Sequence, residues 1–311
     1  MQFENHCASA LNSNKQLTVL ATSIFIGIAF PQLASWFKPF LLPTIFLMFT
    51  FAILQIKFSE VWRYALNERA TWYIIIWQLM VLPLTAAILL RPLLSDYFYL
   101  LAVVSLCTGA ITATTALTRM LGLNDSLSLV VGLFGTILMP IPLYLFLNAG
   151  VAIDATVEMS VYLNRILVFI VAPFVLVAAL RAVINERVDE RLRGYMPTAV
   201  LVLLTVFGLS VMDGVQALLL SQPLLLLQYV MLAFAISLGV QLLTFYLLRF
   251  LGSRDAMTAC LLSAYRNMGL VAAIAGASLG EHFFIYVGVW QLPMYTLPLL
   301  LKKIYRYDDM R

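Results

Sequence analysis

The sequence predicts an all-α membrane protein whose ten transmembrane helices form two inverted repeats of five. Three observations lead to this prediction. Of the 311 residues, 63% are hydrophobic and only 11% are charged, whereas a soluble domain carries about 25% charged residues. The apolar residues gather in runs long enough to cross a bilayer. The two halves of the chain also share weak similarity at a constant offset.

Ten segments are apolar and long enough to span a membrane, since about 20 such residues cross the hydrocarbon core. Within lipid, a helix satisfies all its own backbone groups. The seventh segment is the shortest, and the eighth is long enough to tilt or to include a short surface helix. The ten predicted spans are residues 17–35, 39–57, 71–90, 97–118, 126–149, 160–182, 196–213, 223–250, 256–278 and 282–301.

Lysine and arginine predict the orientation, because they concentrate in short cytoplasmic loops. With a cytoplasmic N-terminus, fifteen of the nineteen lie on the cytoplasmic side and three on the other, and Arg266 belongs to neither. We therefore expect residues 1–16 and 302–311 to form cytoplasmic ends. No basic region precedes a short apolar core at the start, so a cleaved signal peptide is not expected. The charged stretch 181–197 is expected to be a solvated connection whose basic residues set the topology.

An offset of 153 residues aligns the two halves. Five spans per half give the halves opposite orientations, which is the plan of many secondary transporters. Repeat 1 is expected at 17–149 and repeat 2 at 160–301, and residues 150–195 contain the start of the sixth span and the linker. The aligned pairs are Cys107 with Cys260, Leu117 with Leu270, Gly135 with Gly288, and Pro140 with Pro293.

Arg266 is the only charged residue in the stretch 256–280. An arginine at a helix centre costs roughly 2.5 to 3.5 kcal/mol on insertion scales, so it is expected to face a cavity or a partner. The offset places it opposite Ala113, within the polar stretch "TGAITATT" at 108–115. Broken helices at such polar positions expose N–H and C=O groups that can hold ions and carboxylates. Arg266 could line a functional cavity or clamp the broken helix, and the two roles are compatible.

Ten spans in two inverted sets, polar fourth and ninth spans, and the "RNMGL" motif at 266–270 together resemble the bile acid:sodium symporter family. The resemblance implies a panel domain, built on the first two spans of each half. It also implies a core domain in which the fourth and ninth helices are discontinuous and cross each other. Members of this family typically carry organic anions inward, driven by two sodium ions bound behind the crossover.

The chain departs from the family at the sodium ligands. The family's ninth-span pattern Glu-x-x-x-Gln-Asn-Ser-Gly-Leu has Leu262 here at the glutamate, Arg266 at the glutamine and Met268 at the serine. The family's fourth-span Ser-Asn pair falls on Thr115 and Ala116.

The two hydroxyl ligands of the family's fifth span fall on Leu129 and Leu133. A small shift of the alignment restores Ser126 or Ser128 but not the glutamate. Sodium needs several hard oxygen ligands. We therefore expect no metal site, with the sodium sites degraded at Leu262, Ala116, Leu129 and Leu133.

Candidate site residues follow from the polar interruptions and the resemblance. A single threonine in lipid often bonds only to its own helix, but the cluster as a whole is interpreted as a cavity wall. Gln78 is interpreted as a packing or cavity-wall residue. The predicted substrate-binding residues are Arg266, Asn267, Thr112, Thr114, Thr115, Tyr265 and Gln291. The predicted helix-break and crossover residues are Gly109, Gly269, Pro140 and Pro293.

The functional hypothesis is a secondary active transporter of small organic anions that works by alternating access. Bile-acid-like and pantoate-like monocarboxylates both suit a single cation in a neutral cavity. Sodium dependence is expected to be reduced or lost, because Arg266 supplies the positive charge that sodium brings in relatives. Two alternatives stay open: an ordinary sodium-coupled symporter, and a metalloid exporter-like carrier for arsenite that uses Cys107.

Other classes are disfavoured. With two histidines and no paired nucleophile and base, the sequence offers no catalytic arrangement, and no filter motif indicates a channel. No cofactor is expected, and sodium or a proton is the candidate coupling ion. The expected partners are the organic anion and the lipid bilayer, not nucleic acid, and the oligomeric state is left open. The expected location is a bacterial inner membrane.

Overall fold

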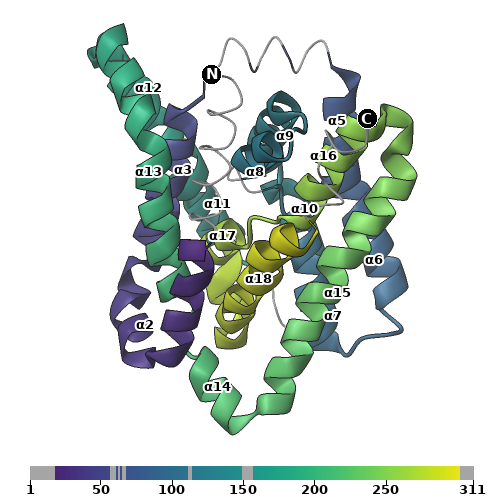
Figure 1. Cartoon of the computed structure of the whole chain (residues 1–311). Coiled ribbons are helices and arrows are strands. Elements are labelled where there is room, and N and C mark those ends of the chain that lie inside the picture. The colour runs from purple at the N-terminus through teal and green to yellow at the C-terminus, as the bar shows by residue number, and fades with distance from the viewer. Residues whose placement is uncertain are drawn as a thin grey trace. The chain divides into compact units, whose positions relative to one another are not determined.

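The structure, a computed structural model, describes residues 18–56, 61, 64, 68–110, 114–148 and 157–301 (Figure 1). Within these ranges the secondary structure is helical, and no strand occurs. The chain separates into two compact units. The first unit comprises Met1–Lys57, Glu158–Leu227 and Ala272–Tyr295, and the second comprises Phe58–Val157, Gln228–Val271 and Thr296–Arg311. Each unit is therefore assembled from distant parts of the sequence.

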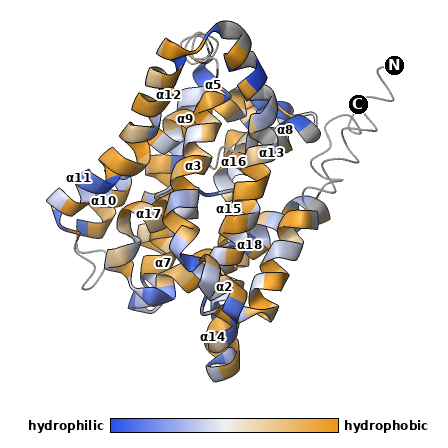
Figure 2. Cartoon of the chain, turned by 90° about the vertical axis from the view of Figure 1, so that its left-hand side faces the viewer, coloured by the Kyte–Doolittle hydropathy of each residue, from blue (hydrophilic) through white to orange (hydrophobic). Residues whose placement is uncertain are grey.

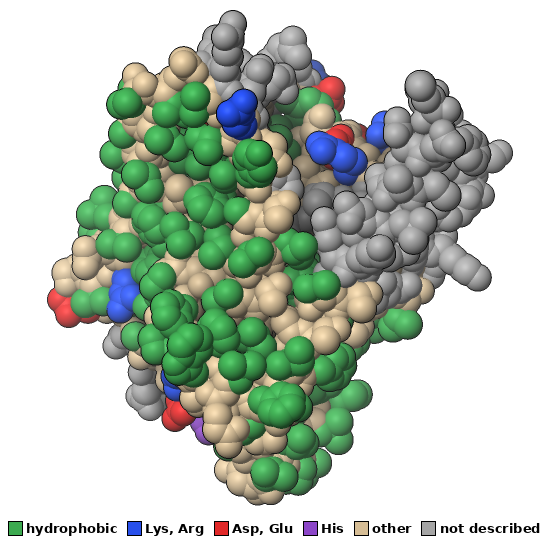
Figure 3. All heavy atoms as spheres, turned by 60° about the vertical axis from the view of Figure 1, so that its left-hand side comes forward, with side chains coloured by type: hydrophobic (Ala, Val, Ile, Leu, Met, Phe, Trp, Pro, Cys, Tyr) green, Lys and Arg blue, Asp and Glu red, His purple; other side chains and the backbone are tan. Residues whose placement is uncertain are grey.

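Among the described residues, five helices are long and apolar enough to cross a membrane, and a sixth is counted if one bent pair forms a single span. Large apolar side chains are exposed along them, including Ile88 and Leu224. The helices are largely coloured as hydrophobic in Figure 2, and apolar side chains cover much of the face seen in Figure 3. Such a surface suits lipid and not water, so the chain is a membrane protein. The five helices are Pro31–Leu54, Arg69–Leu90, Met159–Val183, Gly194–Ser221 and Pro223–Leu251.

The remaining predicted spans are shorter or interrupted. Asp125–Leu138 and Pro140–Asn148 are bent by 41° at Met139. Pro140 begins the second helix of this pair, as its assignment as a helix-break residue predicts. Apolar helices of intermediate length occupy Thr18–Ala29, Asp96–Leu106 and Met268–Leu279. Ten complete spans are thus not established by helix length, and the inverted repeat stays a prediction.

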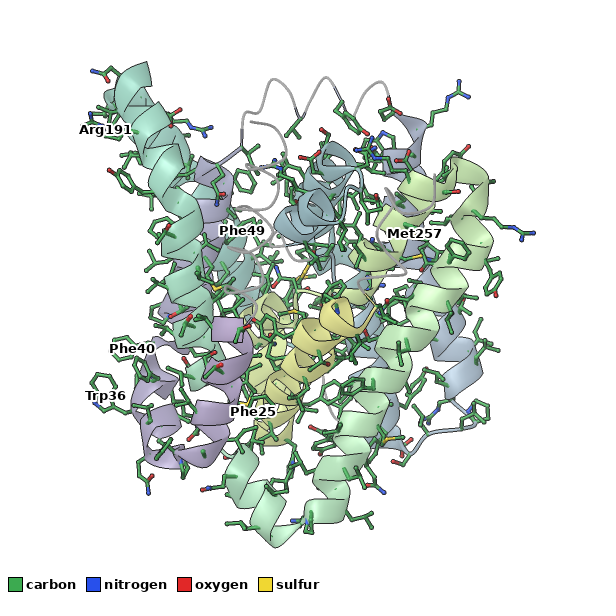
Figure 4. All side chains as sticks on the ribbon, in the orientation of Figure 1. Phe25, Trp36, Phe40, Phe49, Arg191 and Met257 are labelled. Carbon is green, nitrogen blue, oxygen red and sulfur yellow. The ribbon has the colours of Figure 1, made fainter. Side chains whose placement is uncertain are left out.

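The first unit packs α13 along α3 and α2, with α12 also against α3. The rings of Phe49 and Phe174 meet edge to face at 5.8 Å between α3 and α12, and Figure 4 labels Phe49 on α3. The elements of this unit are Thr18–Ala29, α2 Pro31–Phe37, η1 Lys38–Phe40, α3 Leu41–Leu54, α11 Met159–Ile166, η3 Leu167–Val171, α12 Ala172–Val183, α13 Glu186–Ser210 and α14 Val215–Ser221.

The first predicted span, 17–35, is wrong at its end. Its helix stops at Ala29, six residues early, and α2 begins at Pro31. Proline disfavours helical conformation in the residue before it, and Phe30 accordingly has ψ of 77°. Pro31 then begins the next helix, since a first-turn position needs no N–H donor.

The charged stretch 181–197, predicted as a solvated connection, is largely helical. Asn185 caps α13, and its side chain accepts the N–H of Val188 at 3.0 Å, as a helix N-cap does. Helix α13 therefore begins at Glu186, whereas its apolar stretch of membrane-spanning length begins at Gly194, close to the predicted start at residue 196.

Arg181 holds the end of α3. Its Nη2 donates to the carbonyls of Leu54 and Ile56, each at 2.9 Å, and its Nε lies 3.6 Å from Asp189 Oδ1. The last carbonyls of a helix lack intrahelical donors. Arg181 thus satisfies two acceptors where α3 ends.

The second unit places α9 in contact with α5, α8, α10 and α16. Trp77 Nε1 also donates to Thr244 Oγ1 at 2.9 Å, which joins η2 to α15. The elements are α5 Arg69–Ile76, η2 Trp77–Val81, α6 Leu82–Leu90, α7 Asp96–Leu106, α8 Thr114–Met120, α9 Asp125–Leu138, α10 Pro140–Asn148, η4 Arg249–Leu251 and α16 Ser253–Ala264. Three helices contribute to both units: α15 Pro223–Leu248, α17 Met268–Leu279 and α18 Glu281–Leu300.

Replacing Arg181 by glutamine is expected to lower the free energy of unfolding by about 2 kcal/mol, because two buried carbonyls lose a charged donor. Thermal unfolding of the detergent-purified protein measures this effect. Arg191→Gln is the matched control, since Arg191 is an exposed residue of α13 (Figure 4). Equal destabilisation by both changes would contradict the capping role.

Candidate functional site

Two helix interruptions meet inside the second unit. α7 ends at Leu106 and α8 begins at Thr114, while α16 ends at Ala264 and α17 begins at Met268. The N–H of Asn267 donates to the carbonyl of Gly109 at 3.0 Å, and Ala110 and Arg266 form an antiparallel bridge. The interruptions expected within 97–118 and 256–278 are therefore both present, and their backbones are hydrogen-bonded to each other.

Asn267 starts the helix that follows the second interruption. Its side-chain Oδ1 accepts the N–H of Leu270 at 3.2 Å, which is how a helix N-cap satisfies an otherwise unpaired donor. Its own N–H is given to the opposite interruption. Gly269, predicted as a break residue, lies in the first turn of α17. Asn267 therefore serves as cap and as bridge.

Gly109 allows the first interruption to lie directly on α9. A Cβ at this position would come within 2.5 Å of the carbonyl carbon of Gly135 and 2.9 Å of the Thr136 nitrogen. Real Cβ atoms do not approach backbone this closely. The predicted crossover glycine is thus required by a close contact between two stretches of backbone.

Arg266 is the charged centre of the site. Its side chain is 1% exposed. Its Nη1 donates to the carbonyl of Thr108 at 2.6 Å and to that of Gln78 at 3.4 Å. Its Nε and Nη2 have no hydrogen-bond partner among the described residues. The arginine therefore uses one nitrogen to hold backbone, and two of its donor nitrogens are unpaired.

The Gln78 carbonyl is available because of a proline five residues later. In the π segment η2, the N–H of Leu82 bonds back to the carbonyl of Trp77. The same five-residue spacing would pair Pro83 with Gln78, but proline has no N–H. Single π turns of this kind are frequent at functional sites. The Pro83 position therefore leaves Gln78 with an acceptor that Arg266 uses.

The predicted threonines behave differently from one another. Thr114 is 3% exposed, and its Oγ1 has no partner within the described part of the chain. Thr115 Oγ1 lies 3.4 Å from Ser128 Oγ, and Thr118 Oγ1 donates to a carbonyl of its own helix. Thr112 lies outside the described residues. Tyr265 is buried beside Arg266 in the chain.

Gln291 and Pro293 belong to the first unit, whereas Arg266 belongs to the second. Gln291 is 2% exposed, and its Nε2 donates to the carbonyl of Val287 at 3.0 Å. α18 runs unbroken from Glu281 to Leu300, so the expected interruption at Pro293 does not occur. The role of Gln291 in substrate binding stays a prediction.

Three of the positions aligned with sodium ligands are leucines. Leu262 and Leu133 are buried, and Leu129 is half-buried, and none carries a side-chain oxygen. Of the two serines that a shifted alignment would supply, Ser126 is exposed and Ser128 contacts Thr115. The side chain of Ala116 is not among those described.

A polar network at the start of α9 and α16 was not predicted from the sequence. Asn124 Nδ2 donates to Asp255 Oδ1 at 2.9 Å and to the Tyr64 hydroxyl at 3.0 Å. Arg254 Nη2 donates to the carbonyl of Leu123 at 3.0 Å. Burial raises the pKa of Tyr64. Asn124 is the N-cap of α9, and nothing in the sequence indicated its distant partners.

No model of a known protein family matches this chain, and no curated protein matches it either. The assignment of function therefore rests on the geometry of the crossover and on its charge.

Gly109→Ala is expected to lower the free energy of unfolding by about 2 kcal/mol, as overpacking against rigid backbone does. Gly132→Ala is the matched control, because its nearest neighbour, the Ala110 oxygen, would lie 3.9 Å from the new Cβ. Alanine is also the better helix former, so the control is expected to hold or gain up to about 1 kcal/mol. Thermal unfolding in detergent measures both. Similar losses would show that the contact with Gly135 is not limiting.

Proposed function

We propose that this protein is a secondary active transporter of small organic anions, with Arg266 as the fixed cation of its binding site. One observation carries the proposal. A guanidinium that is 1% exposed holds two backbone carbonyls through Nη1, while Nε and Nη2 have no partner among the described residues. Each further step follows from the chemistry of that group.

The unpaired donors are the pair that a carboxylate recognises. Nε and Nη2 form one edge of the planar guanidinium, and their parallel N–H bonds match the two oxygens of a carboxylate. A buried charge without a counterion is costly, and no carboxylate of the described residues forms an ion pair with Arg266. An organic anion on this edge supplies both the charge and the hydrogen bonds. The clamp and the ligand thus occupy different sides of one side chain.

A monocarboxylate suits this site better than a dianion. The guanidinium of Arg266 supplies one full positive charge. Its hydrogen-bond partners Thr108 and Gln78 offer it backbone carbonyl oxygens, which carry no full charge. A second carboxylate would be buried without a cation, at considerable cost. Bile-acid-like and pantoate-like acids both meet this condition.

Sodium coupling is proposed to be reduced or lost. Sodium would need several hard oxygen ligands, and Leu262, Leu129 and Leu133 offer no side-chain oxygen. The guanidinium already brings a positive charge to the crossover. Uniport, exchange or proton coupling then takes the place of sodium symport.

The division into units supports the likeness to the bile acid:sodium symporter family. The first unit contains residues up to 57 and 158–227, and the second contains both interruptions. The panel and core domains of that family divide the chain in a similar way up to residue 227, whereas Ala272–Tyr295, from the predicted ninth and tenth spans, falls in the first unit. Ten spans in an inverted repeat, cytoplasmic termini and a bacterial inner membrane are part of the same proposal.

Uptake of labelled organic acids into proteoliposomes tests the proposal. Wild-type uptake of a monocarboxylate is expected to be unchanged when a sodium gradient is removed. Arg266→Gln is expected to reduce uptake at least about tenfold, because a neutral amide cannot replace a buried charged donor. Arg249→Gln is the control, since Arg249 is an exposed residue of the same unit.

Three results would contradict the proposal. Wild type that requires sodium, with Arg266→Gln still active, would indicate an ordinary sodium symporter in which the arginine is only a clamp. Uptake of arsenite without any carboxylate would indicate the metalloid carrier. Failure of wild type to transport any acid of the panel would remove the proposed function altogether.

A further inference from the structure

Gln78 is a second unpaired polar group of the crossover. Its side chain is 1% exposed, and both Oε1 and Nε2 lack a partner among the described residues. An amide buried in this state loses its hydrogen bonds to water without replacing them. Sequence analysis interpreted Gln78 as a packing or cavity-wall residue, but packing alone does not require an amide.

The backbone of Gln78 places this amide in the neighbourhood of the charged centre. The carbonyl of Gln78 itself lies 3.4 Å from Arg266 Nη1. Gln78 belongs to the π segment Trp77–Val81, which packs against α9, as does α16 just before Arg266. One residue thus contributes a backbone acceptor to the arginine and an unpaired amide to the same region.

We infer that the Gln78 side chain is a specificity-determining residue that selects carboxylates bearing a hydroxyl group close to the carboxylate. The inference rests on the proposed function, since Arg266 holds the carboxylate itself. The amide has a donor and an acceptor to satisfy. A hydroxyl accepts from Nε2 and donates to Oε1, whereas an oxo group only accepts and a methylene does neither. The site therefore favours hydroxy acids over oxo acids, and oxo acids over unsubstituted acids.

A structural role for Gln78 makes a different prediction. If Oε1 serves only to accept from an unpaired donor of Arg266, then loss of the amide weakens the binding of every carboxylate by a similar factor. If the amide contacts substrate, its loss removes the preference among acids and leaves the unsubstituted acid nearly unaffected. The pattern across matched acids separates the two roles.

The test uses Gln78→Met, which keeps the length of the side chain and removes its polar atoms. Four probes share one skeleton: butanoate, 2-oxobutanoate, 2-hydroxybutanoate and 3-hydroxybutanoate. Each competes with counterflow of the best-transported acid of the panel, and each is added to detergent-purified protein to measure thermal stabilisation. Gln241→Met is the control, because Gln241 is also buried in the second unit but donates to the carbonyl of Ser237 at 3.1 Å.

Wild type and the Gln241 variant are expected to bind one of the hydroxy acids about tenfold or more tightly than butanoate, because a site built for a hydroxyl rejects the analogue without one. Gln78→Met is expected to bind the hydroxy acid and butanoate equally, with butanoate affinity unchanged. Both results together support the inference.

Three outcomes overturn it. If wild type binds the four acids equally, the proposed selectivity is wrong. The proposed function then still stands if Arg266→Gln abolishes transport. If Gln78→Met weakens the binding of all four acids by the same factor, the role of Gln78 is to hold Arg266 in place. No exchange and no stabilisation by any carboxylate removes both the inference and the proposed function.

Discussion

The hydrogen bond from Arg266 Nη1 to the carbonyl of Thr108 is the contact on which the second unit depends. Each broken helix leaves backbone donors and acceptors without intrahelical partners, and in lipid no water is available to satisfy them. A guanidinium answers this need because it carries five donors in one rigid plane. It joins the interruption after α7 to the interruption before α17, and Asn267 completes the join with its own N–H. What the arginine leaves unpaired on its other edge is where the proposed substrate binds.

Residues far from Arg266 in the sequence make this contact possible. Pro83 cannot donate to Gln78, so the π turn delivers a second carbonyl to the guanidinium. Gly109 lets the first interruption lie against the backbone of α9 at Gly135. The backbone conformations at the π turn, at Gly109 and at Gly135 are therefore all compatible with the same arrangement around Arg266. Such agreement is what specifies a unique arrangement in a polar, buried site.

The sequence was sufficient to predict those residues of the site whose burial in a membrane costs free energy. A lone charge in an apolar stretch is conspicuous, so Arg266 and the break around it could be predicted, and so could the role of Gly109. The partners of Arg266 could not be predicted, because both are backbone carbonyls. Every residue carries such a carbonyl, so the residue types do not indicate which ones the arginine contacts. The unpaired amide of Gln78 was visible only as a glutamine in an apolar run.

The helix ends differ from the limits of the apolar segments where a proline or a capping residue determines the backbone conformation. The stretch before residue 196 is charged and was expected to be a solvated connection; the apolar span does begin nearby at Gly194, but the cap at Asn185 starts the helix itself at Glu186. Pro31 ended the first helix early in the same way. Both signals are present in the sequence, since a proline and a capping asparagine fix backbone conformation irrespective of polarity. Hydropathy measures where a helix crosses lipid, and it does not measure where the helix ends.

Chemical rescue of Arg266→Ala tests the central claim most directly. The truncated side chain leaves room for a small cation at the crossover. Carboxylate uptake by this variant in proteoliposomes would be measured with ethylguanidinium, with guanidinium and with sodium added in turn. We expect uptake to be lost in the variant, restored in part by the two guanidinium ions, and not restored by sodium. Restoration by sodium alone, or a variant that transports as well as wild type without any added cation, would contradict it.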